Sequence, residues 1–264
     1  MKFKTLISFV SIFALICVFS SCDKEKEEPQ QQTATDTADN FGNRPLPSEP
    51  FVEQLVDGGF ETYWFWSEMS DGSRCIDYKS SMLLSLNCLY ALKDILNSAT
   101  APITTQFDKD SHGGKYALKL ITGRLVDEYN NELLIPGAIA PLNDNFIEEF
   151  LSGGSISITR PYTKTPTAIK GYFKYHPELG DSASVTVMLY NNEKEVIGVA
   201  RWLQKTEVNT WTPFYEPVQY SSNETPAFIS LVYASSAAYN FDDLLHCQGQ
   251  EGSTLWLDDM ELEF

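Results

Sequence analysis

The residue of this chain that most needs a partner is a carboxylate in its last segment. Read at strand period, Trp256, Asp258, Met260, Leu262 and Phe264 share one face, which we expect to be the buried one. Asp258 would then be a carboxylate at the inner end of an apolar strand. A buried carboxylate is costly unless hydrogen bonds, a cation or a metal satisfy it. The pattern therefore predicts a partner for Asp258 elsewhere in the chain.

The remaining motifs and the charge of the sequence exclude several kinds of functional site. His112, His176 and His246 form no cluster, and the sequence has neither a CxxC pair nor an HExxH motif, so we do not expect a zinc site. It also has no GxSxG elbow, phosphate-binding loop or nucleotide fingerprint. The formal net charge of −17 repels phosphate backbones, so nucleic acid is excluded as an expected partner.

The elements that must position these residues are strands. Polar and apolar residues alternate in the second half of the chain, and turn signals such as Asn191-Asn192 separate the alternating runs. Strands are expected at 155–159, 167–175, 184–190, 196–204, 211–219, 227–234 and 254–264. A rhythm of about eight to ten short strands without long helices is typical of an antiparallel sandwich. The predicted fold class is therefore all-β.

Motifs at the two ends of the chain resemble a known domain. Gly-Gly-Phe-Glu in residues 55–64 and Leu-Asp-Asp-Met-Glu-Leu at the end resemble the terminal strand pair of carbohydrate-binding modules with a jelly-roll fold. Together with Arg160-Pro161 and residues 168–175 and 252–259, they make residues 55–264 similar to the putative carbohydrate metabolism domain of Bacteroidetes surface lipoproteins. The resemblance implies one antiparallel jelly-roll β-sandwich, which we place at residues 51–264.

The resemblance also implies a metal site. In sugar modules of this type a calcium ion often pins the first and last strands, and the matching ligands here are Glu61, a backbone oxygen of Gly114 or Lys115, and Asp258. Oxygen ligands at about 2.3–2.6 Å suit calcium better than zinc. Residues 108–120 resemble the loop that enters the second long strand, and their paired glycines let carbonyls turn inward. The alternative is that Glu61 caps a turn and Asp258 bonds to backbone amides.

Sugar recognition requires aromatic faces for the apolar side of a pyranose and polar groups for its hydroxyls. Candidate carbohydrate-binding residues are Trp64, Trp66, Trp202, Tyr239 and Phe241. Alternation sends Trp64 and Trp66 to the same face, and we expect at least one of them to lie in the core. Tyr239 and Phe241 are favoured because they belong to a long loop before the last strand.

The segment 80–96 has apolar residues at a spacing that suits a helical face. Related chains instead run an irregular loop with an Asn here, before a strand like Pro102–Thr105. We therefore expect a loop with a short helical turn. Cys75, Cys88 and Cys247 permit one disulfide with a free thiol, or three buried thiols.

The N-terminus has the features of an exported lipoprotein. Residues 1–21 place Lys2 and Lys4 before an apolar run too short for a good membrane span, which predicts a signal peptide. Residues 19–22 resemble a lipobox that makes Cys22 the acylated N-terminus, the alternative being an ordinary signal peptide with a chance Cys. Acyl chains tether a protein to a bilayer without spanning it. Residues 22–50 would then form the anchor and a flexible linker, since residues 29–50 have almost no large apolar side chain.

The acidic run at residues 23–28 is similar to the signal that sends Bacteroidetes lipoproteins to the outer face, although a solvated charge run looks the same. These features predict a protein anchored by lipid to the outer membrane and exposed on the cell surface. We expect it to bind glycans or help process them. A glycoside hydrolase is the first alternative, and an adhesion or assembly subunit that binds other envelope proteins is the second.

Glycoside hydrolysis is the less favoured hypothesis. A glycosidase requires two carboxyl groups about 5–10 Å apart. Asp258 and Asp259 are not expected to form that pair, because adjacent strand residues point to opposite faces. The acids expected in loops or at strand ends are Glu148, Glu149, Glu216, Asp242 and Asp243.

Overall fold

The structure of the chain is a computed structural model. The structure describes residues 57–68, 74–80, 83–87, 102–126, 129, 132–142, 158–237 and 249–264. These residues contain no α-helix, and hence none that is long and apolar enough to cross a bilayer. Every strand pair among them is antiparallel, which confirms the predicted all-β class.

One main sheet has five strands in the order β13, β10, β16, β5 and β4. Their bounds are Val208–Pro217 (β13), Ala168–His176 (β10), Thr254–Glu263 (β16), Ala117–Ile121 (β5) and Thr105–Asp108 (β4). The C-terminal strand therefore lies in the middle of this sheet, between two strands that are far from it in sequence. β16 is therefore hydrogen-bonded to a strand on each side, β10 and β5.

The second main sheet has seven strands. Six of them follow the order β14, β12, β11, β15, β8 and β3, and β9 pairs with β15 beside this path. Their bounds are Gln219–Tyr220 (β14), Val196–Gln204 (β12), Ala183–Tyr190 (β11), Phe228–Ala234 (β15), Ala138–Ala140 (β8), Leu84–Ser85 (β3) and Arg160–Pro161 (β9). Two hairpins complete the described strands, β1 (Trp64–Glu68) with β2 (Arg74–Tyr78) and β6 (Gly123–Val126) with β7 (Glu132–Ile135).

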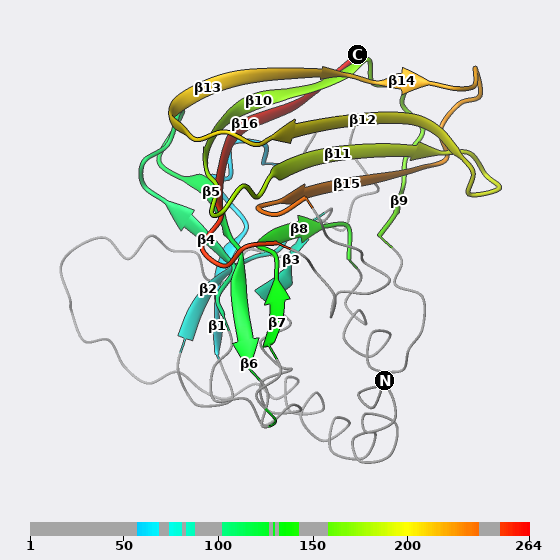
Figure 1. The fold of residues 1–264 in the computed structure, drawn as a ribbon. Helices are drawn as coiled ribbons and strands as arrows, with labels where there is room; N and C mark the ends of the chain where they lie inside the picture. Colours follow the sequence, from blue (N-terminus) through cyan, green and yellow to red (C-terminus); the bar gives the residue numbers. More distant parts are fainter. Residues whose placement is uncertain are drawn as a thin grey trace, which may run out of the picture.

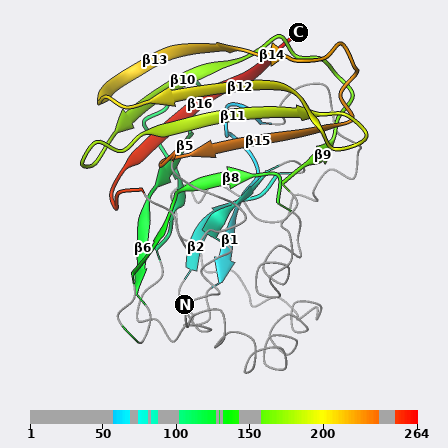
Figure 2. The same ribbon diagram turned by 45° about the vertical axis from the view of Figure 1, so that its right-hand side comes forward.

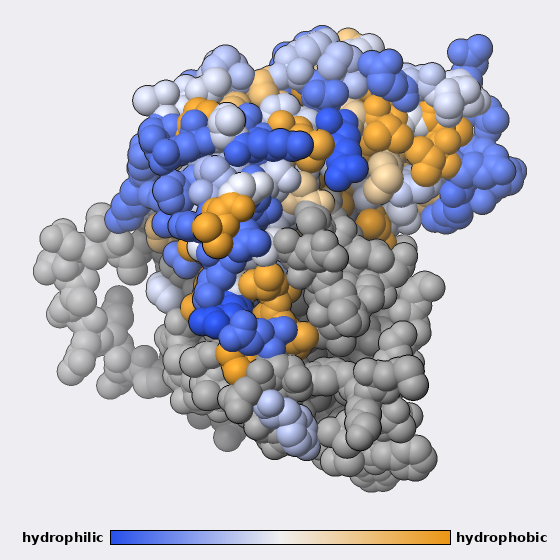
Figure 3. All heavy atoms as spheres, in the orientation of Figure 1, coloured by the Kyte–Doolittle hydropathy of each residue, from blue (hydrophilic) through white to orange (hydrophobic). Residues whose placement is uncertain are grey.

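The two main sheets pack face to face as a jelly-roll sandwich. In two views, β13 and β10 lie above β11 and β15, and β16 runs diagonally behind β12 and β11 (Figures 1 and 2). The core between them takes alternate residues from both sheets, including Ile169, Phe173, Tyr175, Val185, Val187, Leu189, Ile229, Leu231 and Tyr233. The predicted strands at 167–175, 184–190, 196–204 and 227–234 are confirmed to within one residue at each end. On the outer surface, Figure 3 shows hydrophobic residues in several small groups among hydrophilic ones.

The last strand departs from strict alternation. Lys170 pairs with Glu261 while Tyr172 pairs with Asp258, so β16 has one more residue than β10 between these two pairs. This extra residue is a β-bulge, and Asp259 within it has a positive φ of 48°. A bulge of this kind reverses the faces to which the residues on its two sides point.

The bulge corrects the predicted face of β16. Its core residues are Leu255 and Leu257 before the bulge and Met260 and Leu262 after it. Trp256 therefore points away from the core, although strict alternation placed it on the buried face. The prediction failed because alternation was carried through a position where the backbone does not alternate.

The predicted loop with a short helical turn in the segment before β4 is interrupted, where it is described, by the two-residue strand β3, and a short 3-10 turn follows at residues 86–87. Asn87 is buried, and its side-chain oxygen accepts hydrogen bonds from the N–H groups of Thr104 (2.8 Å) and Thr105 (3.0 Å). Its amide group donates to the Thr105 carbonyl at 2.8 Å. Asn87 thus joins this segment to the first residues of β4. Most of the segment 80–96, including Cys88, lies outside the described residues, as does Cys247.

Candidate functional site

The two ends of the domain meet at the bulge in β16. The N–H of Met260 donates to the carbonyl of Gly58 at 2.8 Å, and a Cβ added to Gly58 would lie 1.9 Å from the Met260 carbonyl oxygen. Only glycine allows this approach. Gly59 lies beside both carboxylates of the bulge, since a Cβ there would be 4.0 Å from Asp258 Oδ1 and 3.6 Å from Asp259 Oδ1. The first and last segments therefore meet, as predicted, but the predicted pairing of a first and a last strand is wrong. Residues 57–63 form no strand, β1 pairs with β2, and β16 lies between β10 and β5.

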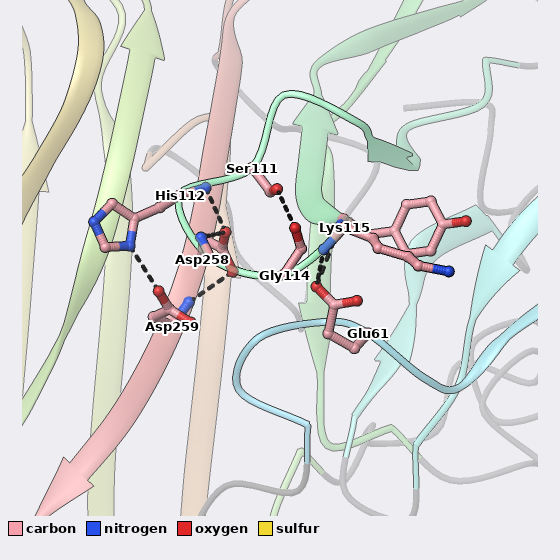
Figure 4. A network of polar contacts seen from close by, with 9 residues as sticks. Glu61, Ser111, His112, Gly114, Lys115, Asp258 and Asp259 are labelled. Atoms are coloured by element: carbon pink, nitrogen blue, oxygen red, sulfur yellow. Dashed lines mark hydrogen bonds and ion pairs between the residues drawn. The ribbon is translucent and has the colours of Figure 1, made fainter.

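Glu61 continues this contact to the loop between β4 and β5. Its Oε1 accepts hydrogen bonds from the backbone N–H groups of Lys115 (2.7 Å) and Tyr116 (3.1 Å), as Figure 4 shows. Gly114 precedes them with a φ of +59°, and a Cβ there would lie 2.0 Å from the same Oε1. The glycine therefore permits both the left-handed backbone and the close approach of the carboxylate.

Asp258 is bound by the same loop. Its Oδ2 accepts from the N–H groups of His112 (2.7 Å) and Gly113 (3.1 Å), and its Oδ1 accepts from the N–H of Asp259 (2.8 Å). The Asp258 residue is 0% exposed. Burial raises the pKa of its carboxyl group to about 6, against the opposing effect of the three amide hydrogen bonds. The predicted partner of Asp258 is thus a set of backbone amides.

Asp259 adds a side-chain contact, since its Oδ2 lies 2.6 Å from Nδ1 of His112. Asp258 and Asp259 therefore both face one loop, and the prediction that they point to opposite faces is wrong. The bulge is again the reason, because the positive φ of Asp259 brings its side chain round to the same loop. We call Glu61, Asp258 and Asp259 with residues 111–116 the carboxylate latch.

The latch has the geometry of the amide alternative. Calcium takes about six to eight oxygen ligands. Here Glu61 Oε1 and both oxygens of Asp258 face N–H groups, and the Gly114 carbonyl accepts from Ser111 Oγ at 3.3 Å. No set of three or more His, Cys, Asp or Glu side chains in the described part of the chain is placed to hold a metal. Oxygen atoms that already accept hydrogen bonds from N–H groups do not form a calcium site in this arrangement. Calcium binding stays a prediction.

The three aromatic candidates from the sequence that the structure describes do not come together. Trp64 is 1% exposed and packs edge-on against Tyr78 in the core, with ring centroids 5.0 Å apart. Trp202 stacks on Phe214 at 4.7 Å, on the core side of β12. Trp66 is exposed on the β1–β2 hairpin. The two loop candidates, Tyr239 and Phe241, lie outside the described residues.

A different group of aromatic residues lies on the outer face of the five-stranded sheet. Tyr172 on β10 stacks with His112 at a centroid distance of 3.5 Å and an angle of 13°. Trp211 on β13 meets the edge of the same His112 ring at 6.4 Å. Trp256 on β16 and Tyr215 on β13 complete the group, which we call the aromatic face.

Charged groups border these rings. Lys174 Nζ lies 4.7 Å from the Trp211 ring centroid and 5.1 Å from that of Trp256, and it pairs with Asp110 at 2.5 Å. The indole N–H of Trp256 donates to Asp108 Oδ2 at 2.8 Å. Such cation–π contacts and hydrogen bonds hold the rings in fixed positions. The alternation of Lys170, Tyr172 and Lys174 with the core residues of β10 was the available signal for this face.

Comparison with family models finds no match, and no curated protein sequence matches the chain. Among solved structures, a "putative glycoside hydrolase" from Bacteroides thetaiotaomicron has a TM-score of 0.54 and 16% identity, over 76% of this chain and 70% of that one. A second structure with that description, from Bacteroides vulgatus, has a TM-score of 0.52 and 19% identity, over 76% and 90%. The chain shares the fold of these two proteins. Membership of the putative carbohydrate metabolism domain family stays a prediction.

The latch can be tested at Gly114. We expect Gly114→Ala to lower the free energy of unfolding by about 2 kcal/mol more than Gly180→Ala does, because its Cβ would force Glu61 away from two backbone amides. Gly180 is the matched control, since its φ is also positive (+81°) but a Cβ there would meet nothing within 4 Å. Urea unfolding of both variants measures the difference. Equal losses would contradict the latch.

Metal removal tests the fit of the latch to calcium. We expect the thermal midpoint of the full chain to be the same in excess EDTA and in excess calcium, because Glu61 Oε1 and both carboxylate oxygens of Asp258 already accept hydrogen bonds from backbone amides. A ligand that binds only the folded state raises the midpoint by mass action. A midpoint that rises with calcium and falls with EDTA would show that a cation replaces those amides.

Proposed function

We propose that this protein is a glycan-binding β-sandwich and that the aromatic face is its binding surface. The observation that carries the proposal is the placement of Trp211, Tyr172 and Trp256 from three adjacent strands on one outer face. Aromatic faces cover the apolar side of a sugar ring, and polar groups at their edges bind its hydroxyls. Asp108 lies at the indole N–H edge of Trp256, and Lys174 Nζ lies over the rings of Trp211 and Trp256.

Preorganisation supports the same function. The His112 ring is held between its contact with Asp259 and its stack on Tyr172, so the aromatic face is attached directly to the carboxylate latch. Side chains that are already fixed lose little conformational entropy when a ligand binds. The latch would therefore lower the entropic cost of binding although its backbone amides face away from the ligand.

Glycan binding is tested with an array of purified oligosaccharides, followed by calorimetry on the best ligand. We expect Trp211→Ala to weaken that ligand by about tenfold or more, equivalent to about 1.4 kcal/mol, and Tyr215→Ala to weaken it as well. Trp66→Ala is the matched control, because Trp66 is 55% exposed and belongs to the separate β1–β2 hairpin. Tyr215 is 53% exposed, so its variant should fold normally.

Three results would replace this proposal. Variants of the aromatic face that bind as tightly as Trp66→Ala would remove this face from the site. Reducing ends released from the ligand, and lost on a single Asp→Asn or Glu→Gln change, would favour the glycoside hydrolase. Co-purification with another envelope protein, without binding to any glycan, would favour the adhesion subunit.

We also propose that the chain is a lipid-anchored protein of the outer membrane, on the basis of the residues that resemble a lipobox. Cys22→Ala should move the protein from the membrane fraction to the soluble fraction, because the acyl chains that supply membrane affinity would be lost. Cys17→Ala is the control, since Cys17 lies inside the expected signal peptide. Equal membrane retention of both variants would contradict acylation at Cys22.

A further inference from the structure

A strip of ring side chains runs along β13, the edge strand of the five-stranded sheet. Trp211, Pro213 and Tyr215 alternate with core-side residues such as Phe214, so their side chains share the outer face. Pro213 is exposed, and Tyr215 has 53% of its surface open to solvent. A strand rises about 3.3 Å per residue, so the Cα atoms of Trp211 and Tyr215 lie about 13 Å apart. This ring strip is therefore longer than one sugar ring.

Polar side chains meet at the Tyr215 end of the ring strip. Lys170 on β10 lies opposite Tyr215 on β13 and opposite Glu261 on β16. Its Nζ lies 3.0 Å from Glu263 Oε2 and 3.5 Å from Glu261 Oε2. The Tyr215 hydroxyl donates to the other carboxylate oxygen of Glu263, Oε1, at 3.0 Å. We call Lys170, Glu261, Glu263 and the Tyr215 hydroxyl the polar cluster.

The polar cluster is open to solvent and can make further hydrogen bonds. The side chains of Lys170, Glu261 and Glu263 are 34%, 49% and 38% exposed. A carboxylate oxygen can accept about two hydrogen bonds. Each oxygen of Glu263 accepts one from the described residues. The hydrogen bonds from Lys170 and Tyr215 also lower the pKa of Glu263, so this carboxylate is ionised at neutral pH.

The polar groups at the Trp256 end of the aromatic face are less available. Lys174 is 8% exposed, because its ammonium group lies against the rings of Trp211 and Trp256 and pairs with Asp110. Asp108 already accepts from the indole N–H of Trp256 at 2.8 Å. Exposed rings and available polar groups therefore lie together at the Tyr215 end.

We propose that a neutral, extended glycan lies along the ring strip and that the polar cluster binds hydroxyl groups of the sugar on Tyr215. The proposal rests on the proposed glycan-binding function and names its ligand class and the residues that select it. A sugar hydroxyl both donates and accepts, so Glu263 can accept from one hydroxyl while Lys170 donates to its neighbour. The cluster holds one ammonium group and two carboxylates, and this excess of negative charge repels a uronic acid. A straight strip suits an extended β-1,4-linked chain.

Calorimetry on the full chain tests the proposal with two neutral probes, the β-1,4-linked hexamers of glucose and of mannose. We expect at least one of them to bind, and Glu263→Gln and Lys170→Met each to weaken that binding about tenfold. Glu132→Gln is the matched control, since Glu132 accepts from Arg124 at 2.8 Å on the separate β6–β7 hairpin. Exposed ion pairs contribute little to stability, so all three variants should fold, and the control should bind within about twofold of the parent chain.

Acidic probes test the ligand class. The β-1,4-linked hexamers of glucuronic and mannuronic acid carry a carboxylate where the neutral probes carry a hydroxymethyl group. We expect each acid to bind the parent chain about tenfold more weakly than its neutral counterpart, because the polar cluster has an excess of negative charge. This difference should narrow in Glu263→Gln, which removes one of the two carboxylates. A purely structural role of Glu263 would leave the difference unchanged.

The outcomes separate this proposal from the preceding one. Equal affinities of Glu263→Gln and Glu132→Gln would overturn the polar cluster as a subsite. Acidic hexamers that bind as tightly as neutral ones would overturn the ligand class, as would the absence of binding by both neutral hexamers. None of these results concerns Trp211, whose variant is tested with the ligand found on the array. An array without any glycan ligand would instead overturn the proposed function itself.

Discussion

The structure depends on backbone amides that bind two carboxylates where the ends of the domain meet. Residues 112–116 donate four N–H groups, two to Asp258 and two to Glu61. Hydrogen bonds to ionised acceptors are stronger than those between neutral groups, and a buried carboxylate without them would be costly. The segment before β1, the β4–β5 loop and the C-terminal strand are thereby joined at one point.

The bulge in β16 connects this junction to the surface. Its extra residue brings Asp258 and Asp259 to the same loop, and it directs Trp256 outward while Leu257 and Met260 remain in the core. The His112 ring contacts the Asp259 carboxylate through Nδ1 and stacks on Tyr172. One local irregularity of the backbone therefore positions both the latch and part of the aromatic face.

The outward sides of the two main sheets differ in what they expose. On the five-stranded sheet, Lys119 and Lys174 are paired with acids and lie beside aromatic rings. On the seven-stranded sheet, the outward side chains of Ser184, Thr186, Ser230 and Val232 are buried. Charged and aromatic side chains therefore gather on the five-stranded sheet.

The amino-acid sequence by itself determined the fold class and most strands of the second half, because period-two alternation reflects a local property of the extended backbone. The resemblance of the two terminal motifs also predicted correctly that Gly59 lies near Asp258 and that Glu61 meets the loop of Gly114 and Lys115. Tertiary structure alone decided the rest. Alternation cannot reveal a bulge, since the extra residue at Asp259 exists only relative to the partner strand β10. For the same reason the aromatic face was missed, because Trp211, Tyr172 and Trp256 become neighbours only when three strands distant in sequence pair.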